Sequence, residues 1–423
     1  CDGSLMIYTF SLVIIYARRE FLMTTSEPVT TESIFAVLKE TVAARGLPNQ
    51  FYTDRSALTV DRDHLFAKTW SGLGFASDIP EPGDAKPVDW LGVPLLMVRD
   101  RDGQVHVHHN VCSHRGRQLL DSPCRLKASI RCPYHSWNYA FNGQLLGTPH
   151  IGGVNVHDSE GFDRPANSLH SVPSAVWCDI VFINLSGDAG SFSDFIAPVQ
   201  KRWRKYWGET GPEELVPGGA DSRATLDVAS NWKLAIENYC ESYHLPFVHP
   251  ELNSYSRLED HYEVFDEDGE SFSGQGTRVY NLAEVAGTRL PRLQYWPEPL
   301  EREAEYLSLY PNLMIGLQAD HFFTVLLEPL SEAHTREHVR LLFVGEGAQD
   351  PTFAEARQKT LASWENVFAE DVSMVEGMQR GRHSPAYTGG VFSPAMDGPT
   401  HHFHRWVARR MLLAQDSSEA LAG

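Results

Sequence analysis

Two short segments that each combine one cysteine with one histidine constrain this chain more than any other feature. Cys112 and His114 stand on either side of one serine, and Cys132 and His135 follow after residues 115–131. Such a set can bind a tetrahedral zinc ion, or a two-iron, two-sulfur cluster with both cysteines on one iron and both histidines on the other. In zinc fingers the ligands within a segment are usually alike, whereas here each segment is mixed and can reach both irons. The sequence therefore favours the iron–sulfur cluster, and a structural zinc site is the alternative.

The residues around these ligands point the same way. The first segment reads N-V-C-S-H-R-G and the second C-P-Y-H-S-W, in which Gly116 and Pro133 suit tight loops whose backbone N–H groups turn toward the sulfurs. These stretches resemble the cluster motif of the Rieske non-haem iron oxygenase α subunits. The resemblance implies a [2Fe-2S] cluster bound by four residues, Cys112, His114, Cys132 and His135.

The composition narrows the class of protein. A chain of 423 residues with 42% hydrophobic and 22% charged residues is typical of a globular protein of two to three domains. The formal net charge of −19 argues against nucleic acid or an anionic membrane as the main partner. The other cysteines are scattered and form no disulfide framework, which indicates a reducing compartment, so we expect a cytoplasmic protein.

The first residues do not read as a membrane anchor. The apolar run at 5–16 is too short to span a bilayer, and Asp2 is the only charge before it, whereas a signal peptide carries basic residues there. We expect residues 1–22 to be an upstream, non-native segment and Met23 to be the natural start.

Local patterns predict a domain of short strands around the cysteine–histidine segments. Three runs read as strands, at 94–99, 105–108 and 181–184. Asp102-Gly103 and Asn142-Gly143 are hairpin turns, and we place the two metal-binding segments at the tips of two hairpins. Helices are expected before this region, at 31–45 and at 61–72.

A polar, glycine-rich break at 186–191 separates this region from one in which helices and strands mix. There, 322–330 and 339–344 read as strands and 358–378 reads as a long helix. We expect an α+β protein, an all-β Rieske domain followed by a catalytic domain of helices and an antiparallel sheet. The expected divisions are a non-native segment at 1–22, an N-terminal helix at 23–46, the Rieske domain at 47–187, the catalytic domain at 188–413 and a disordered tail at 414–423.

The second region contains a second set of candidate metal ligands. Residues 231–244 read as a helix, on which Glu237, Glu241 and His244 share one face. Pro246 is expected to end that helix, so that His249 returns from a loop. Two histidines placed in this way can take adjacent corners of an octahedron, and one carboxylate would complete the facial triad that binds Fe(II) with open positions.

The carboxylate is expected on the helix at 358–378. That helix has an apolar stripe made of Leu361, Trp364, Phe368, Val375 and Met378. Asp371 falls inside the stripe, and a buried carboxylate is costly unless it is paired or binds a metal. Glu370 and Glu365 lie off the stripe and read as solvated charges. A hydrogen-bonded structural acid is the alternative interpretation of Asp371.

The resemblance extends to this half and covers about residues 47–410. The stretch N-W-K-L-A-I-E-N-Y-C-E-S-Y-H-L-P-F-V-H-P is similar to the mononuclear iron segment of the same family. It implies that His244, His249 and Asp371 bind Fe(II), and that Glu241, where the family usually has Asp, bridges to the cluster of a neighbouring subunit. It also implies a homotrimer that uses O₂ and a separate NAD(P)H-dependent flavin and iron–sulfur reductase, since this chain has no G-x-G-x-x-G unit.

The same stretch suggests a small-molecule substrate. With Glu in the bridging position, E-N-x-x-E-x-Y-H is similar to Rieske enzymes that act on quaternary ammonium compounds such as choline, glycine betaine and carnitine. Aromatic faces attract such cations, and six aromatic residues are candidates: Tyr239, Tyr243, Phe247, Tyr310, Phe322 and Phe323. The histidines of the late stretch H-H-F-H, 401–404, read as a strand surface. One alternative is hydroxylation of an aromatic ring, and another is a Rieske electron carrier without oxygenase activity.

Overall fold

The computed structural model describes residues 20–21, 29–266 and 269–420. The expected upstream segment 1–22 therefore lies outside the described residues, apart from the short strand β1 (Glu20–Phe21). This strand pairs with β2 (Val29–Thr30). None of the helices in the described part of the chain is both long and apolar enough to cross a bilayer.

The N-terminal helices are shorter than the sequence predicts. α1 spans Thr31–Val37, after which the chain turns back so that the Arg45 N–H donates to the Ala36 carbonyl (3.1 Å). Val42, expected on the buried face of a longer helix, is 78% exposed. The helix expected at 61–72 lies earlier, as three short helical segments, α2 (Gln50–Thr53), α3 (Ala57–Asp61) and a π-helical turn (Arg62–Phe66).

Three antiparallel sheets form the region that contains the cysteine–histidine segments. Their strands are β3 (Ser71–Phe75), β4 (Asp84–Trp90), β5 (Val93–Arg99), β6 (Val105–His109), β7 (Cys124–Arg125), β8 (Ile130–Arg131), β9 (Asn138–Tyr139), β10 (Leu145–Gly147), β11 (Ser171–Val172), β12 (Ser174–Trp177) and β13 (Ile180–Ile183). The sheet orders are β11-β6-β5-β4-β7, β10-β9-β8 and β12-β13-β3. The all-β prediction for this region is confirmed.

The second region is built on one antiparallel sheet of eight strands, in the order β14-β23-β22-β21-β20-β17-β16 with β15 paired to β23. These strands are β14 (Leu215–Pro217), β15 (Arg223–Val228), β16 (His261–Phe265), β17 (Phe272–Thr277), β20 (Ala304–Leu309), β21 (Leu313–Leu317), β22 (His321–Ser331) and β23 (His334–Val344). A small hairpin, β18 (Glu284–Val285) and β19 (Thr288–Arg289), lies apart from it. The expected α+β class is confirmed.

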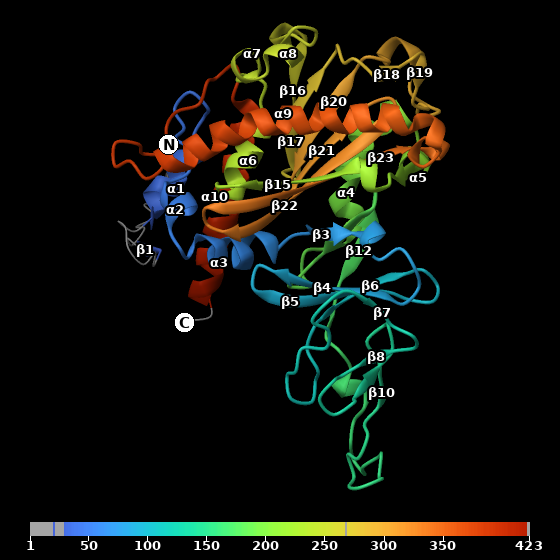
Figure 1. The fold of residues 1–423 in the computed structure, drawn as a ribbon. Coiled ribbons are helices and arrows are strands. Elements are labelled where there is room, and N and C mark those ends of the chain that lie inside the picture. Colours follow the sequence, from blue (N-terminus) through green and yellow to red (C-terminus); the bar gives the residue numbers. More distant parts are fainter. Residues whose placement is uncertain (1–19, 22–28, 267–268, 421–423) are drawn as a thin grey trace, which may run out of the picture.

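Helices cover both faces of this sheet. They are α4 (Phe192–Trp207), α5 (Gly211–Glu214), α6 (Trp232–Tyr239), α7 (Leu245–Val248), α8 (Pro250–Asn253), α9 (Ala354–Gly381) and α10 (Gly398–Ala420). Because side chains alternate along a strand, Phe323 packs against Trp364 of α9 (ring centroids 4.3 Å apart), whereas Phe322 packs against Trp203 of α4 (6.1 Å). Figure 1 shows α9 lying across the sheet, and this face holds the second candidate metal site.

Three predicted elements need correction. The long helix is present as α9, but Met378 of its apolar stripe is 37% exposed, because the stripe ends one turn earlier at the buried Val375. The late histidines 401–404 lie in α10 instead of a strand, and His401 and His404 pack inward from that helix. α10 continues to Ala420, so the tail expected to be disordered from 414 is helical as far as the structure describes it.

The two regions share a hydrophobic core across the predicted boundary at 186–191. Phe75 of β3 and Phe182 of β13 belong to the same buried cluster as Trp203 and Phe322. The boundary itself remains a prediction. Figure 1 shows the strands β4 to β10 at one end of the molecule and the short helices α7 and α8 at the opposite end.

Candidate metal centres

The first cysteine–histidine segment, here called the first cluster loop (residues 110–117), is closed by its own backbone. The Cys112 N–H donates to the Arg117 carbonyl (2.8 Å) and the Gly116 N–H donates to the Cys112 carbonyl (3.0 Å). Gly116 has φ of 71°, a left-handed conformation that favours glycine. The loop joins β6 to β7, which lie at separate positions in their sheet and do not pair, so the predicted hairpin tip is wrong here.

The second cluster loop (residues 131–137) repeats this geometry. The Cys132 N–H donates to the Trp137 carbonyl (2.8 Å) and the Ser136 N–H donates to the Cys132 carbonyl (3.0 Å). Ser136 takes the position that Gly116 has in the first loop, with φ of 58°. This loop joins β8 to β9, which pair, so it is a hairpin tip as predicted. Two loops with one backbone pattern suit a centre that takes equivalent ligands from each.

The four predicted cluster ligands lie together, with the sulfurs inside and the imidazoles outside. Cys112 and Cys132 are 2% and 1% exposed, whereas His114 is exposed. The His114 and His135 ring centroids are 4.7 Å apart, and the Trp137 ring stacks on His114 at the same distance. Burial raises the pKa of the Cys112 thiol, and the nearby Cys132 thiol adds to the rise. The imidazole side of this four-residue site therefore faces solvent, and the thiol side faces the core.

One polar contact to this site cannot be read from the sequence. The Tyr139 hydroxyl is buried and lies 3.2 Å from Cys112 Sγ and 3.0 Å from Ser113 Oγ. The Ser113 N–H also lies 3.3 Å from the same oxygen. A tyrosine shortly after the second loop gave no signal of its own, because its reach to the first loop depends on the pairing of β8 with β9.

We expect Tyr139→Phe to lower the reduction potential of the cluster. A hydroxyl that donates to a ligand sulfur stabilises the more negative, reduced state, and losing about 1.4 kcal/mol of that preference would shift a one-electron potential by about 59 mV. Redox titration followed by visible absorption measures the shift. An unchanged potential at full cluster content would show that the hydroxyl does not act on the sulfur.

The second candidate site differs locally from its prediction. The helix expected at 231–244 ends early, since α6 stops at Tyr239 and Cys240 caps it. Glu237 therefore does not share a face with His244, and it pairs instead with Arg382 (3.1 Å). Pro246 does not end a helix but lies in the first turn of α7, where its missing N–H costs nothing.

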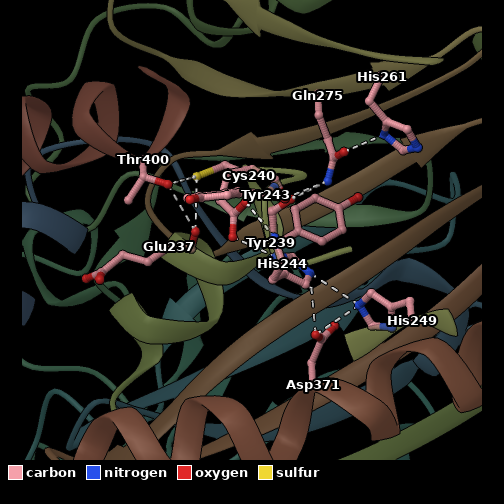
Figure 2. A network of polar contacts seen from close by, with 11 residues as sticks. Glu237, Tyr239, Cys240, Tyr243, His244, His249, His261, Gln275, Asp371 and Thr400 are labelled. Carbon is pink, nitrogen blue, oxygen red and sulfur yellow. Dashed lines mark hydrogen bonds and ion pairs between the residues drawn. The ribbon is translucent and has the colours of Figure 1, made fainter. Parts of the chain in front are cut away.

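The three predicted iron ligands converge from separate elements. His244 precedes α7, His249 stands between α7 and α8, and Asp371 comes from the middle of α9. His244 Nε2 lies 3.2 Å from His249 Nε2, and Asp371 Oδ1 lies 3.1 Å from His249 Nε2 and 3.6 Å from His244 Nε2. Figure 2 shows the three side chains pointing toward one another.

This triangle has the size of one face of a coordination octahedron. With metal–ligand bonds of about 2.1 Å, adjacent octahedral ligands lie about 3.0 Å apart and opposite ligands about 4.2 Å apart. Two of the three distances in the site, 3.1 and 3.2 Å, lie close to the adjacent value, and the third, 3.6 Å, lies midway between the two values. The site therefore fits a 2-His-1-carboxylate metal centre.

The hydrogen bonds around the site leave three atoms with free lone pairs facing one another, namely Nε2 of His244, Nε2 of His249 and Oδ1 of Asp371. His244 Nδ1 lies 2.6 Å from Glu241 Oε1, and His249 Nδ1 lies 2.7 Å from Glu370 Oε2. Since a carboxylate only accepts, each Nδ1 carries the proton and each Nε2 keeps its lone pair. Asp371 Oδ1 is buried and has no hydrogen-bond donor among the described residues. A metal cation between the three atoms satisfies this arrangement, and such outer carboxylates orient metal-binding imidazoles.

Glu370 was expected to be a solvated charge, and that prediction is wrong. Its contact with His249 arises because the turn between α7 and α8 lies against α9, which sequence spacing does not show. Glu365 is exposed, as predicted. Glu241 does reach His244, although through the turn after α6 and not along a helix.

Comparison with known proteins identifies both regions. Residues 69–158 match the Rieske [2Fe-2S] domain, and residues 219–413 match the catalytic domain of the ring-hydroxylating α subunit. The chain belongs to the Rieske non-haem iron oxygenase α subunits. Members of this family contain a [2Fe-2S] cluster and a mononuclear iron, so both expected cofactors and the oxidoreductase class are confirmed.

The similar oxygenases include enzymes for quaternary ammonium compounds. The choline monooxygenase of Amaranthus tricolor is 27% identical over 85% of this chain and 76% of its own length. The carnitine monooxygenase oxygenase subunit of Escherichia coli is 26% identical over 81% of this chain and 86% of its own length. A solved quaternary ammonium Rieske monooxygenase has the same fold, with a TM-score of 0.70 at 23% identity over 88% of this chain and 97% of its own.

A narrow cavity in this oxygenase adjoins Asp371, one of the three predicted iron ligands. Its walls include Asp371 and Phe368 of α9, Asn238 and Tyr239 of α6, and Glu337 of β23. Glu337 is 6% exposed, and burial together with the Asp371 carboxylate raises its pKa to about 8. Sequence reasoning missed Glu337. It stands two residues from the buried Thr335 and two from the buried Val339, so all three side chains lie on the inward face of β23.

Only one of the six aromatic candidates lines this cavity, namely Tyr239. Phe323 lies behind it, with its ring 6.5 Å from that of Tyr239. Phe322 faces α4 on the other side of the sheet, and Tyr310 packs against α10. Tyr243 and Phe247 are 47% and 79% exposed, so they belong to the surface beside the iron site.

Proposed function

We propose that this chain is the oxygenase component of an enzyme that hydroxylates a quaternary ammonium compound with O₂ and electrons from a separate reductase. The oxygenase part is supported most by the triangle of acceptor atoms beside α9. Among the described residues no fourth His, Cys, Asp or Glu ligand atom joins that triangle, which leaves coordination positions for the reaction. The substrate class is supported by the similarity to choline and carnitine monooxygenases.

The proposed ligand roles follow the geometry of the two sites. Cys112 and Cys132 hold one iron of the cluster, and His114 and His135 hold the other. His244, His249 and Asp371 hold the mononuclear Fe(II), which supplies O₂ activation when bound. Glu241 and Glu370 keep the protons of the two imidazoles on Nδ1 and thereby direct both Nε2 atoms at the iron.

Electron transfer is proposed to cross from one subunit to the next within a homotrimer. The two metal sites of one chain lie toward opposite ends of the molecule (Figure 1), so the cluster of a neighbouring chain is the better donor. Exposed aromatic side chains accompany both sites, Tyr134 (59% exposed) beside His135 and Tyr243 beside His244. Apolar surface of this kind suits a subunit contact. Glu241 would then accept a hydrogen bond from a cluster histidine of the neighbouring subunit.

The chemistry depends on which carbon is oxidised. In N-demethylation, a C–H bond of an N-methyl group breaks and a C–O bond forms, while two electrons and two protons reduce the second oxygen atom to water. The resulting carbinol releases formaldehyde and a proton and leaves a tertiary amine. Hydroxylation of the choline type oxidises the alcohol carbon instead, and the product loses water to give an aldehyde.

The test combines the metallated protein, a broad-specificity reductase, NADH and a substrate panel. We expect O₂ uptake with choline, glycine betaine or carnitine, matched about one to one by formaldehyde or by the aldehyde, and three irons per chain. Oxidation of aromatic acids alone would establish ring hydroxylation. Two irons per chain without substrate-dependent O₂ uptake would establish an electron carrier.

A further inference from the structure

We propose that Glu337 is a specificity-determining residue whose carboxylate holds the cationic head group of the substrate beside the iron. This inference rests on the proposed function, because it assigns the recognition of the quaternary ammonium group to one side chain. It concerns the cavity between β23, α6 and α9, which Asp371 and Glu337 both line.

The surroundings of Glu337 give its carboxylate no partner within the described residues. Its neighbours in the sheet are Leu226 on β15 and Leu327 on β22, which are both apolar. The groups that act on its charge are the surrounding protein, through burial, and the like-charged Asp371. An acid that is 6% exposed and lacks a donor or a cation is costly to keep. Glu337 lines a cavity of about 20 Å³, which has room for one water molecule, so the cavity must widen as a head group enters, and the bound cation then supplies the missing charge.

The charges at the iron explain why a cationic substrate needs such a group. Fe(II) with one carboxylate and two neutral imidazoles carries a net positive charge, which repels a second cation in a medium of low dielectric constant. Glu337 offsets this repulsion with its carboxylate, which the iron and the bound cation together keep ionised although burial and the Asp371 carboxylate raise its pKa. A flat apolar substrate would instead leave its carboxylate buried without compensation.

The aromatic walls complete a receptor for a quaternary ammonium group. Tyr239 and Phe368 line the same cavity. The Tyr239 hydroxyl donates to the Ile315 carbonyl (2.9 Å), and the Phe368 ring lies 5.8 Å from that of Trp364, so packing holds both rings in place. An alkylated ammonium group cannot donate hydrogen bonds, so a carboxylate and aromatic rings are the groups that bind it.

The decisive comparison is between a cation and its neutral isostere. Calorimetry under anaerobic conditions would measure the binding of choline and of 3,3-dimethylbutan-1-ol, in which carbon replaces the nitrogen. We expect Glu337→Gln to weaken choline binding at least about 30-fold and to change binding of the neutral alcohol less than about threefold. Glycine betaine and carnitine replace choline in both measurements if the substrate panel selects one of them. Glu365→Gln, which makes the same chemical change on the exposed face of α9, should alter neither.

Several results would overturn the assignment. Equal losses for the cation and the alcohol, or no loss for the cation, would show that the charge of Glu337 does not select the substrate. Loss of the third iron in Glu337→Gln would make it a residue of the metal site instead. If that variant does not fold, Glu337→Asp serves, because it keeps the charge and must keep the preference for the cation. A wild-type protein that neither binds nor oxidises any quaternary ammonium compound would refute the proposed function itself, before any variant is compared.

Discussion

Replacement of Asp371 by alanine is expected to empty the mononuclear iron site while the cluster spectrum persists. The change removes the only anionic atom of the triangle and leaves two neutral imidazoles, which bind Fe(II) weakly on their own. Iron analysis should fall from three to two atoms per chain, and turnover should drop at least about 100-fold, as losses at metal sites do. Visible absorption and EPR of the cluster should be unchanged, since Cys112 and Cys132 lie in a different region.

Glu370→Gln is the matched comparison on the same helix. A glutamine oxygen still accepts from His249 Nδ1, so we expect the iron to remain and its affinity to weaken by about tenfold. Full retention of the third iron in Asp371→Ala would reassign the ligand. Loss of iron in Glu370→Gln with retention in Asp371→Ala would exchange the roles of the two neighbours.

Replacement of Glu241 by alanine is expected to separate electron transfer from metal binding. With Fe(II) in excess, the variant should still hold both metals, because Glu241 touches the iron site only through His244. In stopped-flow mixing of the chemically reduced protein with substrate and O₂, we expect reoxidation of the cluster to slow at least about 100-fold, since the hydrogen-bonded link between subunits is lost.

Glu241→Asp is the control for that experiment. It keeps the charge and the acceptor oxygens at a side chain one methylene shorter, and it should keep most of the wild-type rate. A normal rate in Glu241→Ala would contradict the bridging role. Loss of iron even in excess Fe(II) would show that Glu241 acts on the metal site and not on electron transfer.

The sequence predicted best where the chemistry is local. The predicted ligands of the cluster lie within two short loops, and the histidines 244 and 249 are separated by a single turn of helix. Asp371 could be singled out because a charge inside an apolar stripe breaks a regular pattern. The structure brings these residues together, and their roles as ligands remain predictions that the variants above test.

The sequence predicted poorly where contacts depend on packing between distant elements. Glu370 looked solvated because a helical pattern shows the stripe of one helix but not the turn that lies beside it. Pro246 was interpreted as a helix end although the first turn of a helix accepts proline equally well. Glu337 was missed because the cavity that it lines is formed with residues of α9 and α6, which cover the strand, and not with its neighbours in sequence.

The adjacency of Glu370 and Asp371 has a consequence for how this protein can diverge. Consecutive residues on a helix point about 100° apart, and here Asp371 points into the triangle of predicted iron ligands while Glu370 points to His249 Nδ1. A single inserted or deleted residue in the first half of α9 would turn both acids away together. We therefore expect relatives to tolerate length changes in loops far from this helix and to keep its first half fixed in length.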